Sequence, residues 1–457
     1  MNNKGIKIIT VLVVLNIVVF GVFGILRHQN NIAASADTNV YVSEKTTGDI
    51  VSINCQNDSM PFDFELKDSS WVLASDETFP VSSDTVNEFL EKANNLVAAR
   101  LVSSDGDYER FGLNSPQQTI TLTDSQGVSV TYLIGSYNEN IERYYACEKD
   151  SKNIYIINKS VGDVLVQDLY SYAASYDLSA FSKSTLTSFD CVSPESQVSV
   201  FKAEKDDNSP MGSSSIWRFS QPFNSDTFVD ANKVDALISR LKTAAASKCV
   251  SYSPDETTIE NYGLSNPQYS IKVNYTTDSG QEKEAVLYLG KENDDGSIYI
   301  IFEGAGTIGL LDAETASSLK EYFDGYKYVP QSICAVKKDK VDTMTVTANG
   351  TTYNFAFTDT GYTLNGSPCS EESFEAFYNK LSGIVSNTHS SEAAQTAAGE
   401  NSFTITYHFK DTSYSDVTAV YTPYDDNYYT ASCGEMSGRL VNKRSVESVL
   451  SLLEAIE

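Results

Sequence analysis

Three stretches of the chain carry the same spacing of apolar residues, at positions i, i+3, i+4, i+7, i+10 and i+11. This spacing places the six residues of each stretch on one face of an α-helix. The three sets are Val86, Phe89, Leu90, Ala93, Leu96 and Val97; Val234, Leu237, Ile238, Leu241, Ala244 and Ala245; and Phe374, Phe377, Tyr378, Leu381, Ile384 and Val385. Because the sets recur about every 145 residues, the pattern predicts duplicated domains rather than a short solenoid repeat.

Each copy has the same order of expected elements around its helix. Residues 62–66 and 71–74 read as a hairpin before the first helix, and residues 119–123 alternate apolar and polar side chains after it, as half-buried strands do. The side chains of Asp84, Asp230 and Ser370 are expected to cap the three helices. A strand followed by a second helix closes each copy. The sequence therefore predicts three α+β domains, each an antiparallel sheet with helices packed on it.

A membrane-length apolar run precedes the repeats. Residues 8–26 contain no charge and would span about 28 Å as a helix, close to the hydrocarbon thickness of a bilayer. Lys4 and Lys7 precede the run and only Arg27 follows it closely, which favours a cytoplasmic N-terminus and an extracytoplasmic remainder. A signal peptide cleaved after Ala36 is the competing interpretation, but the run is longer than the usual apolar region of a signal peptide.

These observations predict four segments and a single-pass protein of the cell membrane. The segments are 1–28, the cytoplasmic N-terminus and transmembrane anchor; 29–182, the first α+β repeat with its linker; 183–328, the second repeat; and 329–457, the third, divergent repeat.

The acidic composition restricts the partners of the exported part. All 61 acidic residues follow the apolar run, and the whole chain has a formal net charge of −28. Such a surface repels nucleic acid, and no basic stripe is present in the sequence, so we expect no nucleic-acid binding.

No catalytic, metal or cofactor motif stands out in the sequence. The seven cysteines are far apart without a Cys-x-x-Cys pair, and their odd number leaves at least one free thiol. The three histidines, His28, His389 and His408, have no second ligand at metal-binding spacing, and a phosphate-binding loop is missing. We therefore expect a protein that is not an enzyme and has no catalytic residues, cofactor or metal. An exported hydrolase is a hypothesis with less support, because it would need clustered carboxylates or a Ser-His pair.

Copies one and two share a turn after the long helix. It consists of Phe111, Gly112, Leu113 and Pro116 in the first copy, and of Tyr262, Gly263, Leu264 and Pro267 in the second. Glycine reaches positive φ cheaply and proline forces an extended exit, so the turn reads as a folding signal that ends a short helix and starts a strand. The third copy lacks it.

With these motifs the chain resembles the bacterial family known as domain of unknown function 4340. The family features are the aromatic-Gly-Leu-x-x-Pro turn, a Leu-Ile-Gly or Leu-Gly strand end, here at residues 133–135 and 289–290, and a Tyr-rich hairpin at Tyr144, Tyr145 and Tyr299. The resemblance covers most of residues 45–325. It implies a membrane-anchored extracytoplasmic protein that is often encoded beside an ABC transporter ATPase, its permease and a gliding-motility-type auxiliary subunit. It implies no catalytic residues.

Tyrosine supplies the remaining candidate site. The chain has 28 tyrosines, and Tyr421, Tyr424, Tyr428 and Tyr429 gather in the third copy, where they are candidates for partner binding. Packing in the sheet is the other interpretation. The leading hypothesis is a non-enzymatic, membrane-anchored accessory or scaffold protein of an ABC-type transporter complex, and the alternative is a surface module that binds glycan or peptide.

Overall fold

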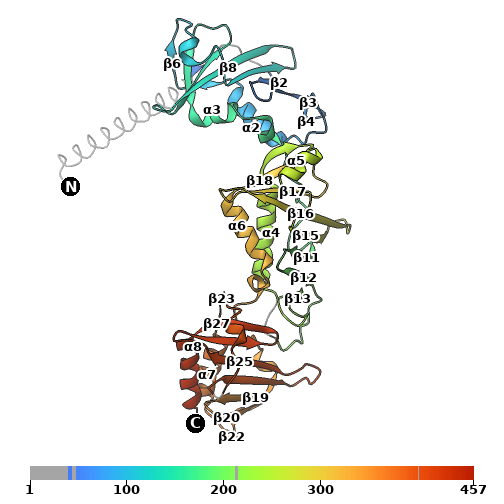
Figure 1. The fold of residues 1–457 in the computed structure, drawn as a ribbon, viewed down its shortest axis with the longest axis vertical. Coiled ribbons are helices and arrows are strands. Elements are labelled where there is room, and N and C mark those ends of the chain that lie inside the picture. Colours follow the sequence, from blue (N-terminus) through green and yellow to red (C-terminus); the bar gives the residue numbers. More distant parts are fainter. Residues whose placement is uncertain (1–39, 44–47, 212–214, 387, 400, 457) are drawn as a thin grey trace, which may run out of the picture. The chain divides into compact units, whose positions relative to one another are not determined.

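The structure is a computed structural model that describes residues 40–43, 48–211, 215–386, 388–399 and 401–456. The chain divides into two compact units, Met1–Ala174 and Ser175–Glu457. The first unit contains one large antiparallel sheet, and the second unit contains two (Figure 1). The predicted α+β class with repeated antiparallel sheets is therefore confirmed, while the four predicted segment borders stay predictions.

The sheet of the first unit has eight strands in the order β4-β3-β2-β7-β8-β9-β10-β6, and every neighbouring pair is antiparallel. Its strands are β2 (Ile50–Gln56), β3 (Phe62–Lys67), β4 (Ser70–Leu73), β6 (Arg100–Ser103), β7 (Gln118–Asp124), β8 (Ser129–Asn138), β9 (Arg143–Glu148) and β10 (Ile154–Asn158). Two short strands, β1 (Val40–Tyr41) and β5 (Val97–Ala98), pair separately. The chain enters the sheet at its centre with β2 and continues to β4 at one edge. It then crosses through a helix to β6 at the opposite edge and returns to the centre with β7.

The second sheet repeats this order as β13-β12-β11-β15-β16-β17-β18-β14. Its strands are β11 (Leu186–Val192), β12 (Gln197–Lys202), β13 (Trp217–Gln221), β14 (Lys248–Tyr252), β15 (Tyr269–Thr276), β16 (Glu282–Glu292), β17 (Ile298–Phe302) and β18 (Thr307–Leu311).

The third sheet has the same order with one additional short strand at an edge, β22-β21-β20-β19-β24-β25-β26-β27-β23. Its strands are β19 (Val341–Ala348), β20 (Thr351–Thr358), β21 (Gly361–Leu364), β22 (Ser367–Pro368), β23 (Thr388–His389), β24 (Phe403–Phe409), β25 (Val417–Pro423), β26 (Tyr428–Cys433) and β27 (Met436–Asn442). Three sheets with one connectivity are the structural form of the repeats that the sequence predicts.

Two main helices pack together in each copy. They are α2 (Ser83–Ala93) and α3 (Lys159–Leu165), α4 (Ala231–Ala245) and α6 (Ala313–Lys320), and α7 (Glu371–Ser382) and α8 (Lys443–Glu454). In Figure 1, α4 and α6 lie along one side of the second sheet, and α7 and α8 along one side of the third. The apolar stripe of α4 is buried along its full length. Burial of this face, rather than helix propensity, stabilises such a helix.

Two of the three predicted stripes extend too far. Helix α2 ends at Ala93, and Val97 is 42% exposed in the short strand that follows, because Asn95 turns the chain with a φ of +55°. Helix α7 ends at Ser382, and Val385 beyond it is 49% exposed. The helical spacing of apolar residues in the sequence therefore extends beyond the C-terminal ends of α2 and α7.

The predicted N-caps are correct for α4 and α7 but wrong for α2. Asp230 and Ser370 each accept a hydrogen bond from a backbone N–H of the first turn. In α2 this acceptor is Ser82, and Asp84 lies inside the first turn. Serine is an equally good cap, and a carboxylate in the first turn is favoured by the helix dipole.

The predicted membrane anchor at residues 8–26 and the cleavage site after Ala36 lie outside the described residues. In the part of the chain that the structure describes, no helix has the length and apolarity of a membrane span.

Candidate functional site

The aromatic-Gly-Leu turn of the first copy is a packing site. Phe111 ends the short 3₁₀-helix η1 (Glu109–Phe111), and Gly112 follows with a φ of +67°. The ring of Phe111 packs on that of Tyr145, with 4.8 Å between their centroids. The predicted strand end at residues 133–135 is wrong, because β8 continues to Asn138. A Cβ atom on Gly135 would lie 2.4 Å from the carbonyl oxygen of Phe111, so only glycine fits this position of β8 next to the turn. Leu113 is buried in the same cluster, and Pro116 starts the approach to β7.

The second copy builds the same site. Tyr262 follows helix α5 (Glu256–Asn261), and its ring stacks on that of Tyr299 at 4.1 Å. Gly263 has a φ of +70°, Leu264 is buried, and Pro267 precedes β15. The three family features, which are separate in sequence, therefore meet at one point in each of two sheets. Their role is to lock the turn onto the sheet.

The four tyrosines of the third copy do not form one surface. Tyr421 and Tyr429 are buried in the core, whereas Tyr424 is half-buried and Tyr428 is 40% exposed. Tyr428 and Tyr429 are neighbours in β26, and successive side chains of a strand point to opposite faces. Partner binding thus stays a prediction for Tyr424 and Tyr428, and the packing interpretation describes the other two.

A cleft of about 690 Å³ lies between the second and third sheets, within the unit Ser175–Glu457. Four carboxylates line it, together with a guanidinium, three aromatic rings and a thiol. These lining residues are Asp206, Asp226, Asp416, Glu435, Arg218, Phe228, Phe409, Tyr414 and Cys433. The cleft therefore combines apolar walls with an excess of negative charge, a composition that suits a cationic, amphipathic segment.

Contacts across the cleft fix its walls. Tyr414 donates a hydrogen bond of 2.8 Å to Asp206 Oδ2, and the backbone N–H of Asn224 donates one of 2.8 Å to Glu435 Oε2. The Tyr414 bond lowers the pKa of Asp206, and the same bond raises the pKa of Tyr414. The carboxylate of Asp206 is thus held ionised as a hydrogen-bond acceptor.

Arg218 provides the positive charge of this cleft. Its guanidinium lies 3.7 Å from the centroid of the Phe228 ring, and its Nη1 donates to the carbonyls of Ser215 and Trp217. Burial lowers the pKa of Arg218 from its ordinary value. The guanidinium lies over the Phe228 ring, and the stacked pair forms a flat part of the cleft wall.

Arg439 of β27 joins the third sheet to the segment that follows the second sheet. Arg439 is only 3% exposed. It donates hydrogen bonds to three successive carbonyl oxygens of the linker between the second and third sheets, residues 329–340. The acceptors are the carbonyls of Pro330 (2.6 Å), Gln331 (2.9 Å) and Ser332 (2.9 Å). Burial lowers its pKa from the ordinary value for arginine. A guanidinium has five donors in a fixed plane and can therefore bind several carbonyls at once in a defined geometry, whereas lysine has three donors on a single nitrogen.

Tyr326 supplies a second junction from the 3₁₀-helix η4 (Gly325–Tyr328). Its hydroxyl donates to the carbonyl of Ser437, and its ring stacks on that of His389 with 3.7 Å between centroids. Sequence reasoning missed Arg439 and Tyr326 as functional residues. The available signal was one arginine inside an otherwise apolar strand end, Gly438-Arg439-Leu440-Val441, where a charge needs partners when buried.

None of the seven cysteines forms a disulfide, and five of them are buried. Cys334, which packs against the core of the third sheet, forms a pair with Cys433 of β26, and a hydrogen bond between the thiols raises the pKa of Cys334 and lowers that of Cys433. Among the described residues, no group of three or more His, Cys, Asp or Glu side chains is arranged to hold a metal ion.

The fold and these contacts define a tandem array of antiparallel α+β modules whose shared motifs serve packing. The family model described as Domain of unknown function (DUF4340) matches the chain twice, at residues 71–218 and 217–400. The chain therefore belongs to the DUF4340 family, and the predicted resemblance is confirmed. A comparison with curated proteins and one with solved structures each found no match.

The two family matches are offset from the sheets. Each begins at a tryptophan of an edge strand, Trp71 of β4 or Trp217 of β13. The first match covers the helices and the meander of the first sheet and ends in the first three strands of the second. One family unit thus contains parts of two consecutive sheets.

Proposed function

We propose that the protein is a non-enzymatic, membrane-anchored extracytoplasmic accessory protein of an ABC-type, gliding-motility-like transporter complex. In this proposal residues 8–26 anchor the chain with its N-terminus in the cytoplasm. The permease and the auxiliary subunit are the partners, and the cleft between the second and third sheets is where one of them attaches.

One observation carries the proposal. The residues by which the chain resembles its family are used for packing, as the Phe111–Tyr145 and Tyr262–Tyr299 contacts illustrate. The motifs therefore maintain a scaffold, and function falls to surfaces between modules. The cleft is such a surface, with walls fixed by Asp206–Tyr414 and Asn224–Glu435.

The test is co-purification of the full-length chain from membranes in a mild detergent, with the retained proteins identified by mass spectrometry. We expect the transporter permease and its auxiliary subunit to be retained. The variant Asp226→Lys reverses a charge in the cleft, and Asp278→Lys makes the same change in the exposed turn between β15 and β16, away from the cleft. Retention should fall for the first variant and persist for the second. If the wild-type chain retains neither subunit, the accessory role is wrong, and if Asp226→Lys retains both, attachment lies elsewhere.

The alternative function is a surface module that binds peptide or glycan without a transporter. The aromatic rings of Phe228 and Tyr414 beside four carboxylates favour a basic peptide among such ligands. Binding of basic peptides by the purified full-length chain in the absence of other proteins would support this alternative, and its loss in Asp226→Lys would assign it to the cleft.

A further inference from the structure

A second, smaller pocket lies between the same two sheets and has the opposite charge. Its volume is about 220 Å³, and its charged lining residues are Lys233, Lys327 and Arg439, with His389 beside them. None of the described residues that line it carries a carboxylate. A lining whose charged residues are all basic is unexpected in a chain with a formal net charge of −28.

Arg439 is the most buried of these cations. Its three hydrogen bonds go to neutral carbonyl oxygens, and no carboxylate of the described chain forms an ion pair with it. A guanidinium has five N–H donors, so two donors remain for another acceptor after these bonds with described residues. A buried charge without a counter-charge is costly, and an anion in the adjoining pocket would offset that cost.

His389 is held next to this guanidinium. It lies directly opposite Arg439 in the antiparallel pair β23–β27, so both side chains are on the same face. The imidazole is fixed by its stack on Tyr326, and its ring nitrogens form no hydrogen bond with the described residues. It thus has a nitrogen free to donate to an anion at the pocket.

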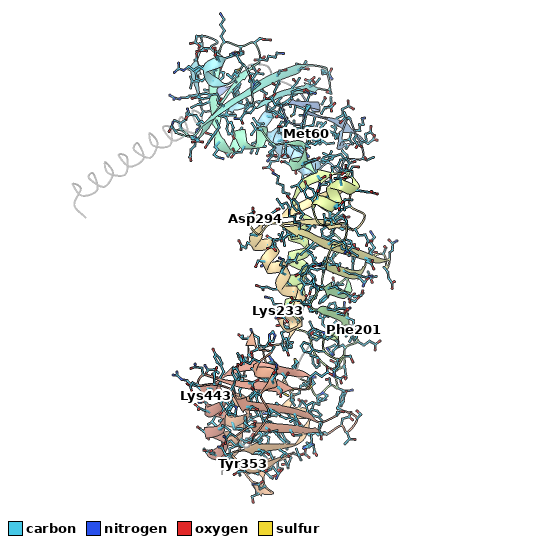
Figure 2. The ribbon with its side chains drawn as sticks, viewed as in Figure 1. Met60, Phe201, Lys233, Asp294, Tyr353 and Lys443 are labelled. Carbon is cyan, nitrogen blue, oxygen red and sulfur yellow. The ribbon has the colours of Figure 1, made fainter. Side chains whose placement is uncertain are left out.

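The two lysines differ in their charge balance. Lys327 forms an ion pair with Glu321, so its charge is already matched. Lys233, which lies in the first turn of α4 and is labelled in Figure 2, forms no ion pair in the part of the chain that the structure describes. Lys233 and Arg439 therefore leave two positive charges unmatched at the pocket.

We propose that this pocket binds a phosphate group, either as the free ion or as a monoester. Phosphate carries about 1.5 to 2 negative charges near neutral pH and has several acceptor oxygens, which suit two unmatched cations and the donors of Arg439 and His389. Distant carboxylates of the acidic surface are screened beyond about 8 Å at physiological salt, so the nearby cations determine the local field. The proposal does not depend on the transporter association.

The experiment is isothermal titration calorimetry on the full-length chain in detergent, with inorganic phosphate, glycerol 3-phosphate and acetate as separate ligands. We expect saturable binding of inorganic phosphate and weaker or no binding of acetate. The variant Lys233→Gln should raise the dissociation constant about tenfold or more, because a hydrogen bond to a charged group is lost. Lys242→Gln, in the last turn of the same helix, is the matched control and should bind as the wild type does.

Each outcome of the titration either supports phosphate binding at this pocket or overturns it. Lack of saturable binding for both phosphates, or equal binding in wild type and Lys233→Gln, would overturn the proposal. Acetate binding as tightly as phosphate would show that the site does not select a dianion and would also overturn it. Binding of glycerol 3-phosphate in addition to the free ion identifies a pocket that accepts an esterified group such as a headgroup, whereas binding of the free ion alone identifies a site for inorganic phosphate. Since Lys233 is partly exposed, its variant is expected to fold, and an unchanged melting temperature checks this.

Discussion

Gly290 lies so close to Tyr262 that a Cβ atom on the glycine would be 2.3 Å from the tyrosine carbonyl oxygen. The same approach joins Gly135 to Phe111 in the first sheet. The glycine within β16 or β8 and the aromatic-Gly-Leu turn are thus two halves of one contact. Their recurrence in order along the chain follows from this close packing of backbone on backbone.

The first prediction is that Gly290→Ala destabilises the second sheet. The added methyl group has no room beside the Tyr262 carbonyl, and Leu264 Cδ2 would be only 2.9 Å away, so the backbone must move. Such overpacking costs about 1–3 kcal/mol. The melting temperature of the purified protein should fall. Gly306→Ala is the matched control, because its Cβ would meet its nearest neighbour at an ordinary 3.5 Å, and a similar loss there would contradict this explanation.

The sequence was sufficient for the elements whose pattern is local. The stripe of α4 was predicted residue by residue, and the turn at Gly112 was predicted from glycine followed by proline, because both depend on neighbours within a few residues. The ends of α2 and α7 were misplaced, since apolar residues at helical spacing continue beyond them, of which Leu96 and Ile384 are buried while Val97 and Val385 are exposed. The spacing of apolar residues indicates which face of a helix is buried, but it does not indicate at which residue the helix ends.

The junction and its two pockets could not be predicted for a different reason. Arg439 contacts Pro330 across 109 positions, and Tyr414 contacts Asp206 across 208. Such pairs depend on how two sheets dock, which depends in turn on surfaces that carry no periodic pattern. The four tyrosines of the third copy show the opposite error, in which residues close in sequence were expected to share one surface. Tyr429 follows Tyr428 directly, but the alternation of side chains along β26 places only Tyr429 in the core. Tyr421 lies in β25 and is buried, whereas Tyr424 lies beyond the end of that strand and is half-buried.

The second prediction is that Arg439→Met weakens the connection between the second and third sheets. The substitution leaves the carbonyls of Pro330, Gln331 and Ser332 without their shared donor, and each lost hydrogen bond to a charged group costs about 1.5–3 kcal/mol before relaxation. Limited proteolysis should cut the linker at residues 329–340 faster than in the wild type. Arg444→Met removes an arginine from the first turn of α8 and serves as the control. Equal cleavage rates in all three proteins would show that Arg439 does not hold the linker.

The third prediction concerns the pH dependence of the Asp206–Tyr414 contact. The hydrogen bond from Tyr414 lowers the pKa of Asp206 in the folded protein, so the contact contributes stability above the ordinary range of aspartate and loses it as the pH falls through the lowered pKa. In Tyr414→Phe the pKa of Asp206 should rise towards its ordinary value. Carboxyl-resolved NMR titration measures both proteins. Asp278, in the exposed turn between β15 and β16, is the internal reference, and a pKa of Asp206 that does not change in Tyr414→Phe would show that the hydrogen bond is not its cause.

The fourth prediction is that Cys334 and Cys433 form a disulfide when an oxidant is supplied. The two thiols share a hydrogen bond, and Arg439 lowers the pKa of Cys433 further, so Cys433 is the thiol that ionises first and attacks. With diamide as the oxidant, the two thiols lose two protons and two electrons, and the diazene is reduced to its hydrazine. Peptide mapping should then detect a cross-link between the segments around residues 334 and 433. Cys334→Ser should prevent it, whereas Cys55→Ser should not, because Cys55 is buried in the other unit with a pKa raised to about 12 by burial. A map in which Cys433 stays a free thiol after treatment, while the remaining protein is still folded, would mean that the pair is held together by packing alone and cannot rotate into bonding geometry.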